Sequence, residues 1–500
     1  MVQEYGFYVG GRWANPRDRK RLETLNPATG EVLATFPQGT KDDVAAAVKS
    51  AKGAFEKWKR TPPPRRGEFL LEAARIFRKR KEELGRIVTT EMGKVIAEGR
   101  GDVQEAIDFY EYASGEGRRF MGYTVPSELP NKICLSIRLP VGPVALVTPW
   151  NFPIAIPAWK SGAALIAGCT VVFKPSSLTP LCGAKVAEVL EEAGVPPGVF
   201  NFIVGPGAAA GDALIRHPDI RAISFTGGVD TGKEVYRAAA ERMIKAGLEL
   251  GGKNPILVME DADLDLLIDG VMFGAFGTAG QRCTATSRLI VHADVYNELL
   301  RRLLKRTEAL KVGNPMDQKI DMGPVASADQ EKKVLEYIEI GKKEGDKLLI
   351  GGKKLRGGAY DRGFFLEPTI FEVKPTKRLA MEEIFGPVLS VIKVKDYTEA
   401  VAVANSVEYG LSSSIYTNDV RRAFAAMQDL EAGITYINAP TIGAEVQMPF
   451  GGVKSTGPTD TREAGFTAVD EFTSVKTVYV DYSGRLQRAQ IDTAKLLGEG

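Results

Sequence analysis

The chain has 500 residues, of which 44% are hydrophobic and 26% charged, with 65 basic against 63 acidic side chains. This length exceeds one compact core and predicts an ordinary globular enzyme of two or three domains. The balanced charge gives no basic excess to favour nucleic acid or an anionic membrane, so we expect neither as a partner.

The chain start and the cysteine content indicate the compartment. Residues 1–6 have neither the basic start nor the apolar core of a signal peptide, and no apolar run reaches the roughly 20 residues of a membrane span. Four cysteines are too few for a disulfide framework in a chain of this size. We expect a cytoplasmic protein in a reducing environment, with thiols free to react.

The first part of the chain is mainly helical. Residues 40–58 form a predicted helix, because Thr40 and Asp43 make a capping box and apolar residues recur at helical spacing. A charged helical region follows from Arg65 to about Ser114, with interruptions expected near Gly93 and Gly101.

From residue 142 onward, short apolar runs alternate with helical segments. The first series has predicted strands at 144–147, 170–173, 200–204, 222–225, 256–259 and 288–291, with helices such as 180–193, 209–216 and 231–243. The second has helix 327–344, strand 387–394, helix 397–406, strand 412–416, helix 419–430 and strand 433–438. Such alternation predicts an α/β fold with two doubly wound parallel-sheet domains, one Rossmann-like for a cofactor and one that carries a reactive thiol.

Two segments do not fit this alternation. Residues 122–140 are typical of an extended hairpin, and 474–482 of a β-rich strand. Because an exposed hairpin has unpaired edges, we expect it to pair with a strand of another subunit; packing within the same chain is the alternative. The predicted domains are a cofactor-binding domain (1–121 and 141–251), a catalytic domain (252–466), an oligomerisation arm (122–140 and 467–485) and a helical tail (486–500).

The most informative residue is Cys283, which follows a loop of small residues. A lone cysteine is more often a small buried hydrophobe than a nucleophile. Here Gly277 and Gly280 allow backbone N–H groups to approach a reacting oxygen. The adjacent Arg282 can favour the thiolate; a side chain that points elsewhere is the alternative. Upstream, Glu249 lies between two leucines, where burial would raise its pKa and suit a water-activating base; half of a buried ion pair is the alternative.

Other candidate groups narrow the chemistry. A cysteine hydrolase would need a histidine base, but the two histidines, His217 and His292, are most simply structural. No Cys/His cluster has metal-ligand spacing, so we expect no metal. Asn151 follows the strand ending at 148, and its side-chain N–H can stabilise an oxyanion; a simple turn residue is the alternative.

Two glycine-rich turns are candidate phosphate sites. Residues 205–211 are one residue too long for G-x-G-x-x-G, so an ordinary turn is as good an interpretation. Residues 227–233 approach a P-loop, but Glu234 stands where magnesium needs Ser or Thr, which excludes ATP hydrolysis. The strand 222–225 before this turn and the helix after it still suit a pyrophosphate.

Six ordered motifs together resemble the NAD(P)-dependent aldehyde dehydrogenase superfamily over about residues 7–482. They are Trp150-Asn151-Phe152-Pro153, Phe173-Lys174-Pro175-Ser176, Phe225-Thr226-Gly227, the run 248–253, Gly280-Gln281-Arg282-Cys283 and the run 383–388. The resemblance implies that Cys283 attacks an aldehyde, that Asn151 and the Cys283 N–H hold the oxyanion, and that Glu249 activates water after hydride transfer to the nicotinamide. It also implies that Lys160 lies near the proton path from Glu249.

The same resemblance implies the binding residues. Those for the cofactor are Thr148, Pro149, Trp150, Lys174, Ser176, Ser177, Gly207, Gly211, Phe225, Thr226, Gly227, Gly228, Leu250, Gly251, Glu383 and Phe385, with Lys174 and Glu383 on ribose hydroxyls. Those for the aldehyde are Phe152, Trp159, Arg282, Thr284 and Phe450. Ser177 departs from the glutamate that NAD-preferring members often have there, which would repel a 2′-phosphate. We therefore expect NADP to be preferred and NAD to be accepted.

Several alternatives stay open. An enzyme that passes the acyl group to coenzyme A or phosphate is disfavoured by Glu249, and a non-enzymatic binding protein by the presence of Cys283, Glu249 and Asn151 together. A thiol esterase is a third possibility. The runs 462–465 and 476–484 are similar to the 2-oxoglutarate semialdehyde dehydrogenase branch, which would need a cationic anchor such as Arg282. The resemblance also implies a homodimer or homotetramer.

Overall fold

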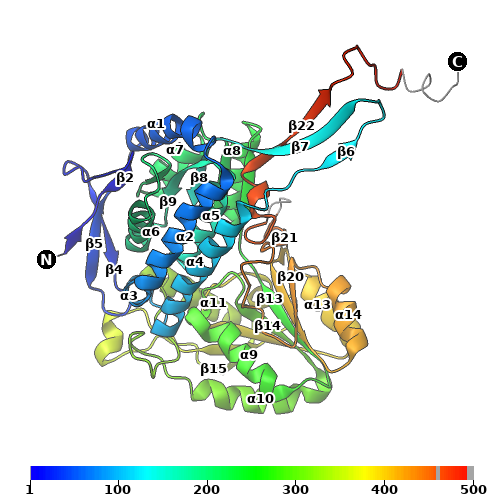
Figure 1. Ribbon diagram of the computed structural model, residues 1–500. Helices are drawn as coiled ribbons and strands as arrows, with labels where there is room; N and C mark the ends of the chain where they lie inside the picture. Colours follow the sequence, from blue (N-terminus) through cyan, green and yellow to red (C-terminus); the bar gives the residue numbers. More distant parts are fainter. Residues whose placement is uncertain (1, 458–461, 492–500) are drawn as a thin grey trace.

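The computed structural model describes residues 2–457 and 462–491. Within these residues, two seven-stranded sheets flanked by helices form two lobes, and a three-stranded arm projects from them (Figure 1). Each lobe is built around its own cluster of buried apolar side chains.

The first sheet has the strand order β12-β11-β8-β9-β10-β2-β3. Its strands are β2 (Phe7–Val9), β3 (Arg12–Ala14), β8 (Pro143–Val147), β9 (Thr170–Lys174), β10 (Phe200–Phe202), β11 (Ala222–Thr226) and β12 (Lys245–Glu249). The strands from β8 to β12 are parallel, whereas β2 and β3 are joined antiparallel at one edge. The order reverses between β8 and β11, and dinucleotides bind at the carboxyl ends of strands at such a switch point.

Helices cover both faces of this sheet. α5 (Ala155–Ala167) and α6 (Pro180–Glu192) lead from β8 to β9 and from β9 to β10, whereas α8 (Val229–Ala240) leads from β11 to β12 in the opposite direction. Right-handed crossovers therefore place α8, with α7 (Asp212–Ile215), on the face opposite α5 and α6. α1 (Lys41–Trp58) contacts α7, and α2 (Pro63–Lys79), α3 (Lys81–Met92) and α4 (Ile96–Glu116) stack beyond α5 and α6.

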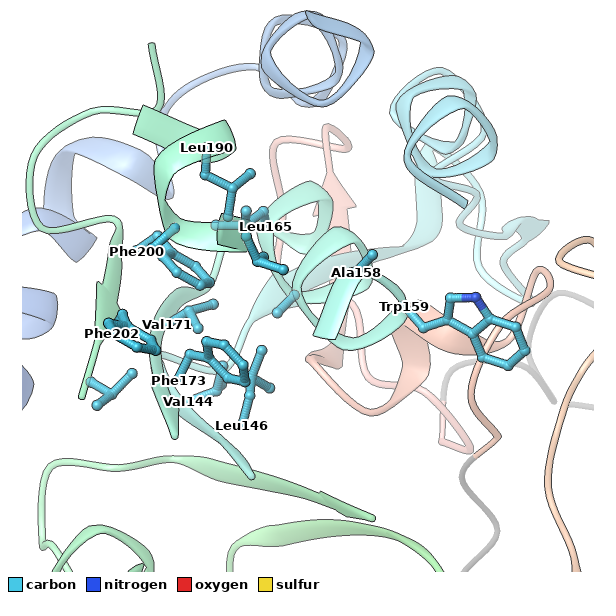
Figure 2. Close-up of a cluster of buried hydrophobic side chains, with 14 of the residues drawn as sticks. Val144, Leu146, Ala158, Trp159, Leu165, Val171, Phe173, Leu190, Phe200 and Phe202 are labelled. Carbon is cyan, nitrogen blue, oxygen red and sulfur yellow. The ribbon is translucent and has the colours of Figure 1, made fainter. Parts of the chain in front are cut away.

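Helix α5 serves both the core and the site. Nearly all of its residues are buried, as expected for a helix that is apolar all round. Figure 2 shows Leu165 of this helix beside Leu190 and Phe200 in the core, whereas Trp159 points away from that cluster. The helix is therefore held on one side by the sheet and presents Trp159 on the other.

The second sheet has the strand order β15-β16-β17-β14-β13-β19-β20. Its strands are β13 (Asn254–Val258), β14 (Thr286–His292), β15 (Lys347–Ile350), β16 (Thr369–Glu372), β17 (Val388–Val394), β19 (Ser412–Tyr416) and β20 (Ile434–Ile437). β15 is antiparallel to β16, and the other pairs are parallel. The associated helices are α9 (Leu264–Phe276), α10 (Ala293–Glu308), α11 (Ala328–Lys343), α12 (Arg378–Met381), α13 (Tyr397–Asn405) and α14 (Val420–Asp429).

The remaining strands form small sheets. β1 (Gln3–Glu4), β4 (Arg21–Leu25) and β5 (Val32–Pro37) make one, and β18 (Tyr409–Gly410) pairs with β21 (Val453–Lys454). The arm consists of β6 (Thr124–Pro126), β7 (Lys132–Pro140) and β22 (Thr473–Asp481), in the order β22-β7-β6.

The expectation that the hairpin pairs with another subunit's strand is wrong for β7. Strand β22 of the same chain pairs antiparallel with all of β7, from Thr473 opposite Pro140 to Asp481 opposite Lys132. The two segments, far apart in sequence, lie side by side in the arm (Figure 1). Local patterns show that a strand edge needs a partner but not which distant segment supplies it.

Other differences concern element boundaries. The predicted helix 40–58 is confirmed, with its capping box, as α1. The following helical region breaks at Arg80 and Gly93, whereas Gly101 lies inside α4. Residues 209–216 begin as a π turn (Gly207–Gly211) before α7. The N-terminal strands β1 to β5 and strand β12 have no counterpart among the predicted elements, because their runs are short and mixed in polarity.

Two predictions reach beyond what the structure tests. Residues 487–491 hold a turn rather than the expected helix, and the rest of the tail lies outside the described residues. The first sheet uses strands between residues 7 and 249 and the second between 254 and 437, but the domain boundaries themselves stay predictions. Among the described helices, none has both the length and the apolar character that a membrane span requires.

Candidate active site

The loop that carries Cys283 has an unusual backbone. It follows α9, and its turn contains Thr278, Ala279 and Gly280 with φ angles of 52°, 52° and 69°. A Cβ on Gly280 would lie 2.2 Å from the carbonyl oxygen of Gly386, so only glycine fits this position. Left-handed residues of this kind are found where the surroundings impose the conformation, often at functional sites.

Two buried side chains hold this loop in place. The Asn254 Nδ2 donates hydrogen bonds to the carbonyl oxygens of Cys283, at 2.8 Å, and Ala285, at 2.9 Å. Gln281 is fully buried, and its Oε1 accepts the N–H of Ala326 at 2.9 Å. The position of Cys283 is therefore set by β13 and by the chain before α11.

Arg282 is engaged by neighbouring side chains. Its Nη2 lies 2.7 Å from Glu98 Oε1, and its Nε donates to Thr278 Oγ1 at 3.0 Å. Burial raises the pKa of the Cys283 thiol to about 12, and the charge of Glu249 raises it further. The guanidinium of Arg282 therefore points to Glu98 and Thr278, and the expectation that it favours the thiolate stays a prediction.

Cys283 lies where two cavities meet. A cleft of about 200 Å³ is lined by Pro149, Trp150, Asn151, Thr226, Gly227, Gly228, Leu250, Gly251, Cys283, Gln330, Lys333, Glu383 and Phe385. A chamber of about 70 Å³ is lined by Glu105, Phe152, Ile156, Trp159, Thr226, Arg282, Cys283, Thr284, Ile442, Gly443, Ala444, Phe450 and Glu463. The thiol can therefore meet one reactant from each side, which is the arrangement that proximity catalysis needs.

Asn151 lies beside the thiol, between β8 and α5. It is buried, and its Nδ2 donates a hydrogen bond to the carbonyl oxygen of Gln281 at 3.1 Å. Because an amide nitrogen carries two donors, a second N–H remains for an oxygen bound near Cys283. The geometry fits the predicted oxyanion role, which stays a prediction.

Glu249 ends β12 and is buried. Its Oε2 has no hydrogen-bond partner among the described residues. Burial, followed by the nearby Glu463, raises the pKa of Glu249 well above its usual value, as the flanking leucines predict. A Cβ on Gly451 would lie 2.5 Å from Glu249 Oε1, so the carboxyl group faces that glycine and does not line either cavity.

Lys160 lies behind the site and does not line either cavity. It is buried on α5, forms an ion pair with Glu463 and donates to Ser224 Oγ at 2.8 Å. Thr226 Oγ1 also donates to Glu463, at 3.1 Å. Burial raises the pKa of a further carboxyl group, Glu471, to about 7. The residues next to Glu463 and Glu471 in the sequence do not predict that either lies near Lys160, because that proximity arises only in the folded chain.

The cleft and the adjoining strand ends fit a dinucleotide. Helix α8 begins at Val229, and its N-cap residue Gly228 provides no side-chain cap, which leaves the backbone N–H groups of the first turn available to an anion. A Cβ on Gly207 or Gly228 would meet nothing within 4 Å, so both turns have open space beside them. The rings of Trp150 and Phe385 meet edge to face at 5.4 Å across the cleft.

The predicted cofactor residues fall into two groups. Pro149, Trp150, Thr226, Gly227, Gly228, Leu250, Gly251, Glu383 and Phe385 line the cleft. Thr148, Lys174, Ser176, Ser177, Gly207, Gly211 and Phe225 lie outside it, on or just beyond β8, β9, β10 and β11. Burial lowers the pKa of Lys174 to about 8, and Glu383 Oε1 accepts the N–H of Gly252 at 2.8 Å.

Sequence reasoning missed part of each cavity. Gln330 and Lys333 reach the cleft from α11, and Gln330 Nε2 donates to the carbonyl oxygen of Phe385 at 2.6 Å. The predicted substrate residues Phe152, Trp159, Arg282, Thr284 and Phe450 all line the chamber, where the rings of Trp159 and Phe450 meet edge to face at 5.4 Å. Glu105, Ile156, Ile442, Gly443, Ala444 and Glu463 were not predicted, because no motif marks them.

Comparison with known proteins shows the family. The aldehyde dehydrogenase family matches residues 13–478. The chain belongs to this family. The α-ketoglutaric semialdehyde dehydrogenase of Bacillus subtilis (strain 168) is 41% identical over 475 residues, which cover 95% of this chain and 97% of that protein. The 2,5-dioxopentanoate dehydrogenase of Saccharolobus solfataricus is 43% identical over 475 residues, or 94% and 98% of the two chains.

A solved structure extends the likeness to the fold. The betaine aldehyde dehydrogenase of Staphylococcus aureus, in complex with NAD⁺, matches with a TM-score of 0.94 and 33% identity over 96% of this chain and 95% of that one. The predicted α/β fold and the resemblance, including its closeness to the 2-oxoglutarate semialdehyde branch, are confirmed. This aldehyde dehydrogenase is an oxidoreductase of the aldehyde group with a nicotinamide cofactor.

Proposed function

We propose that this aldehyde dehydrogenase oxidises an aldehyde to the carboxylic acid through a thioester on Cys283. The observation that supports this most strongly is the place of Cys283 on the walls of both cavities. The Cys283 thiol gives its proton to solvent, and its sulfur bonds to the aldehyde carbon as the C=O π bond breaks. The carbonyl oxygen becomes an oxyanion beside the Asn151 Nδ2 and the Cys283 N–H. The oxidised nicotinamide, when bound in the cleft, supplies the acceptor for the hydride.

Glu249 supports hydrolysis as the second half-reaction. A carboxyl group whose pKa is raised by burial can take a proton from water near neutral pH. The water oxygen bonds to the thioester carbon, the C–S bond breaks, and the acid leaves. Transfer to coenzyme A or phosphate would not need this group. We expect Glu249→Gln to form one equivalent of reduced cofactor rapidly and then to stall as acyl-enzyme; undiminished steady-state turnover would contradict the role.

For the cofactor, we propose a preference for NADP over NAD. Ser177 lies three residues after Lys174, and its Oγ donates to the carbonyl oxygen of Gly205 at 3.2 Å. No carboxylate stands at that position to repel a 2′-phosphate, and Lys174 offers a positive charge nearby. Measured kcat/KM values decide this: a value for NAD about tenfold above that for NADP, or about 1.4 kcal/mol, would overturn the proposal.

For the substrate, we propose the semialdehyde of a 2-oxo dicarboxylic acid. The support is the similarity to two relatives that are named for this activity, together with Arg282 in the chamber wall. A panel of anionic, neutral and cationic aldehydes tests it. A higher kcat/KM for a neutral aldehyde of equal chain length would count against the assignment.

We also propose that the arm joins subunits into a homodimer or homotetramer. One face of its sheet carries Ile133, Ile137, Leu139 and Val480, which are between 40% and 45% exposed in the single chain. Ile133 stands directly opposite Val480 in the register of β7 and β22, so these two side chains form an apolar pair on this face. Such a surface on a projecting arm is typical of a contact between subunits.

A further inference from the structure

Glu105 is a chamber residue that the reaction above does not use. It lies on α4, and its side chain lines the chamber together with Arg282. Its carboxyl group forms no hydrogen bond or ion pair with any residue that the structure describes. A carboxyl group in a cavity wall without such a partner is available to whatever enters the cavity.

The charged groups around Glu105 already have partners of their own. Lys94 pairs with Asp102 at 2.9 Å, and both side chains are fully buried. Arg282 pairs with Glu98 at 2.7 Å. With Glu105 protonated, these four charges balance, whereas an ionised Glu105 would add a net negative charge to the chamber.

The surroundings favour the protonated form. Burial is the main cause that raises the pKa of Glu105 to about 7, and Asp102 is the next. Lys94 and Arg282 act in the opposite direction, and Asp108, one turn further along α4, adds a small rise. A protonated carboxyl group is a hydrogen-bond donor, which an ionised one is not.

Arg282 retains donors for a ligand. Its Nε and Nη2 are used by Thr278 and Glu98, and its Nη1 has no hydrogen bond with a described residue. The guanidinium lies 5.7 Å from the centre of the Phe152 ring, and Trp159 and Phe450 also line the chamber. An aliphatic chain can lie against these rings, and an acidic group at its far end can reach Glu105 and Arg282, which line the same chamber as Cys283.

We propose that Glu105 determines specificity for aldehydes that carry a carboxylate at the far end, by donating its carboxyl proton in a hydrogen bond to that carboxylate beside Arg282. The proposal rests on the proposed function and names the structural basis of its substrate class. Charge-assisted hydrogen bonds between a carboxyl group and a carboxylate are short and strong, whereas two carboxylates repel.

The test compares an anionic with a neutral aldehyde. The kcat/KM for 2,5-dioxopentanoate is divided by that for pentanal, from about pH 6 to about pH 9. Ionisations of Cys283 and Glu249 affect both substrates and cancel in this ratio. For the wild-type enzyme we expect the ratio to fall by about tenfold per pH unit once Glu105 ionises.

Glu105→Gln keeps a donor but cannot ionise. We expect its ratio to be independent of pH and, at about pH 9, at least about tenfold above that of the wild type. Glu111→Gln is the matched control, because Glu111 lies on the same helix and pairs with Arg78 at 2.7 Å, away from the chamber. It should retain the wild-type profile.

Three results would overturn the inference. One is a ratio of kcat/KM values that does not change with pH in the wild type, a measurement that does not depend on the folding of any variant. Another is an unaltered profile in Glu105→Gln. The third is a preference for a cationic substrate: kcat/KM for betaine aldehyde exceeds that for 2,5-dioxopentanoate in the wild type, and the value for betaine aldehyde falls in Glu105→Gln. Glu105 would then bind a cation. If the wild type oxidises neither 2,5-dioxopentanoate nor pentanal, the proposed function itself fails.

Discussion

Gly280→Ala tests whether the backbone of the Cys283 loop is as constrained as the structure indicates. The residue has a φ of 69°, and the added Cβ would lie 2.2 Å from the Gly386 oxygen and 2.5 Å from its carbon. The left-handed conformation costs an alanine about 1–2 kcal/mol. The overlap is with backbone atoms, so a segment must also move by about 1 Å to reach an ordinary contact distance.

A movement of the Cys283 loop or of the segment around Gly386 would disturb the site. The loop leads directly to Cys283, and Gly386 follows Phe385 and Glu383 in the cleft wall. A displacement of about 1 Å at a reacting group can lower the rate by about 10²-fold. We therefore expect kcat/KM to fall by about 10²-fold and the free energy of unfolding by about 2–4 kcal/mol.

The assay is steady-state reduction of the nicotinamide with an aldehyde, together with thermal unfolding. Gly53→Ala is the control, because Gly53 lies inside α1 and a Cβ there would meet nothing within 4 Å. This change should leave kcat/KM unaltered and stabilise the helix by up to about 1 kcal/mol. If Gly280→Ala kept kcat/KM within about threefold of the wild type, the argument from the loop geometry would be refuted.

Four further changes probe other parts of the molecule. Asn151→Ala should lower kcat by about 10²–10³ through loss of an oxyanion donor, and a loss below about tenfold in single-turnover kinetics would contradict that role. Ser177→Glu should shift the ratio of kcat/KM values from NADP towards NAD by at least about tenfold, and an unchanged ratio would show that residue 177 does not contact the 2′-phosphate. Burial raises the pKa of Glu471 to about 7 in the folded chain. Protonation of Glu471 therefore stabilises the folded chain fully below the unfolded pKa of about 4.3, and this stabilisation is lost as the pH rises to about 7. Glu471→Gln should remove this dependence, so the difference in stability between wild type and variant should change by up to about 4 kcal/mol over that range; parallel stability curves would refute it. The double variant Ile133→Lys, Ile137→Lys should reduce the mass measured by light scattering to that of a smaller assembly. An unchanged mass would show that this face of the arm does not join subunits.

Much of the fold followed from local patterns. The capping box of α1 is confirmed, and the strands and helices predicted after residue 142 have counterparts whose bounds differ by a few residues, whereas β12, β15 and β16 were not predicted. These elements are predictable because capping and periodicity act over a few neighbouring residues. The partner of β7 was not predictable, since β22 lies more than three hundred residues further along the chain.

The residues of the site also differ in how far the sequence alone predicts them. Cys283, Asn151 and the aromatic chamber residues lie within short motifs, and the structure brings them together as the motifs imply. The burial of Glu249 was also evident from its two leucine neighbours. Glu105, Gln330 and Glu463 carry no such mark, because their meaning depends on what the folded chain places opposite them.

The amino-acid sequence alone determined the reactive groups and the order of the elements that carry them. It could not determine the surroundings of those groups: Arg282 pairs with Glu98, a residue 184 positions away, and burial raises the pKa of the Cys283 thiol. The reason is physical. Secondary structure and chemical identity depend on neighbours in the chain, whereas desolvation and ion pairing depend on neighbours in space, which only the tertiary structure decides.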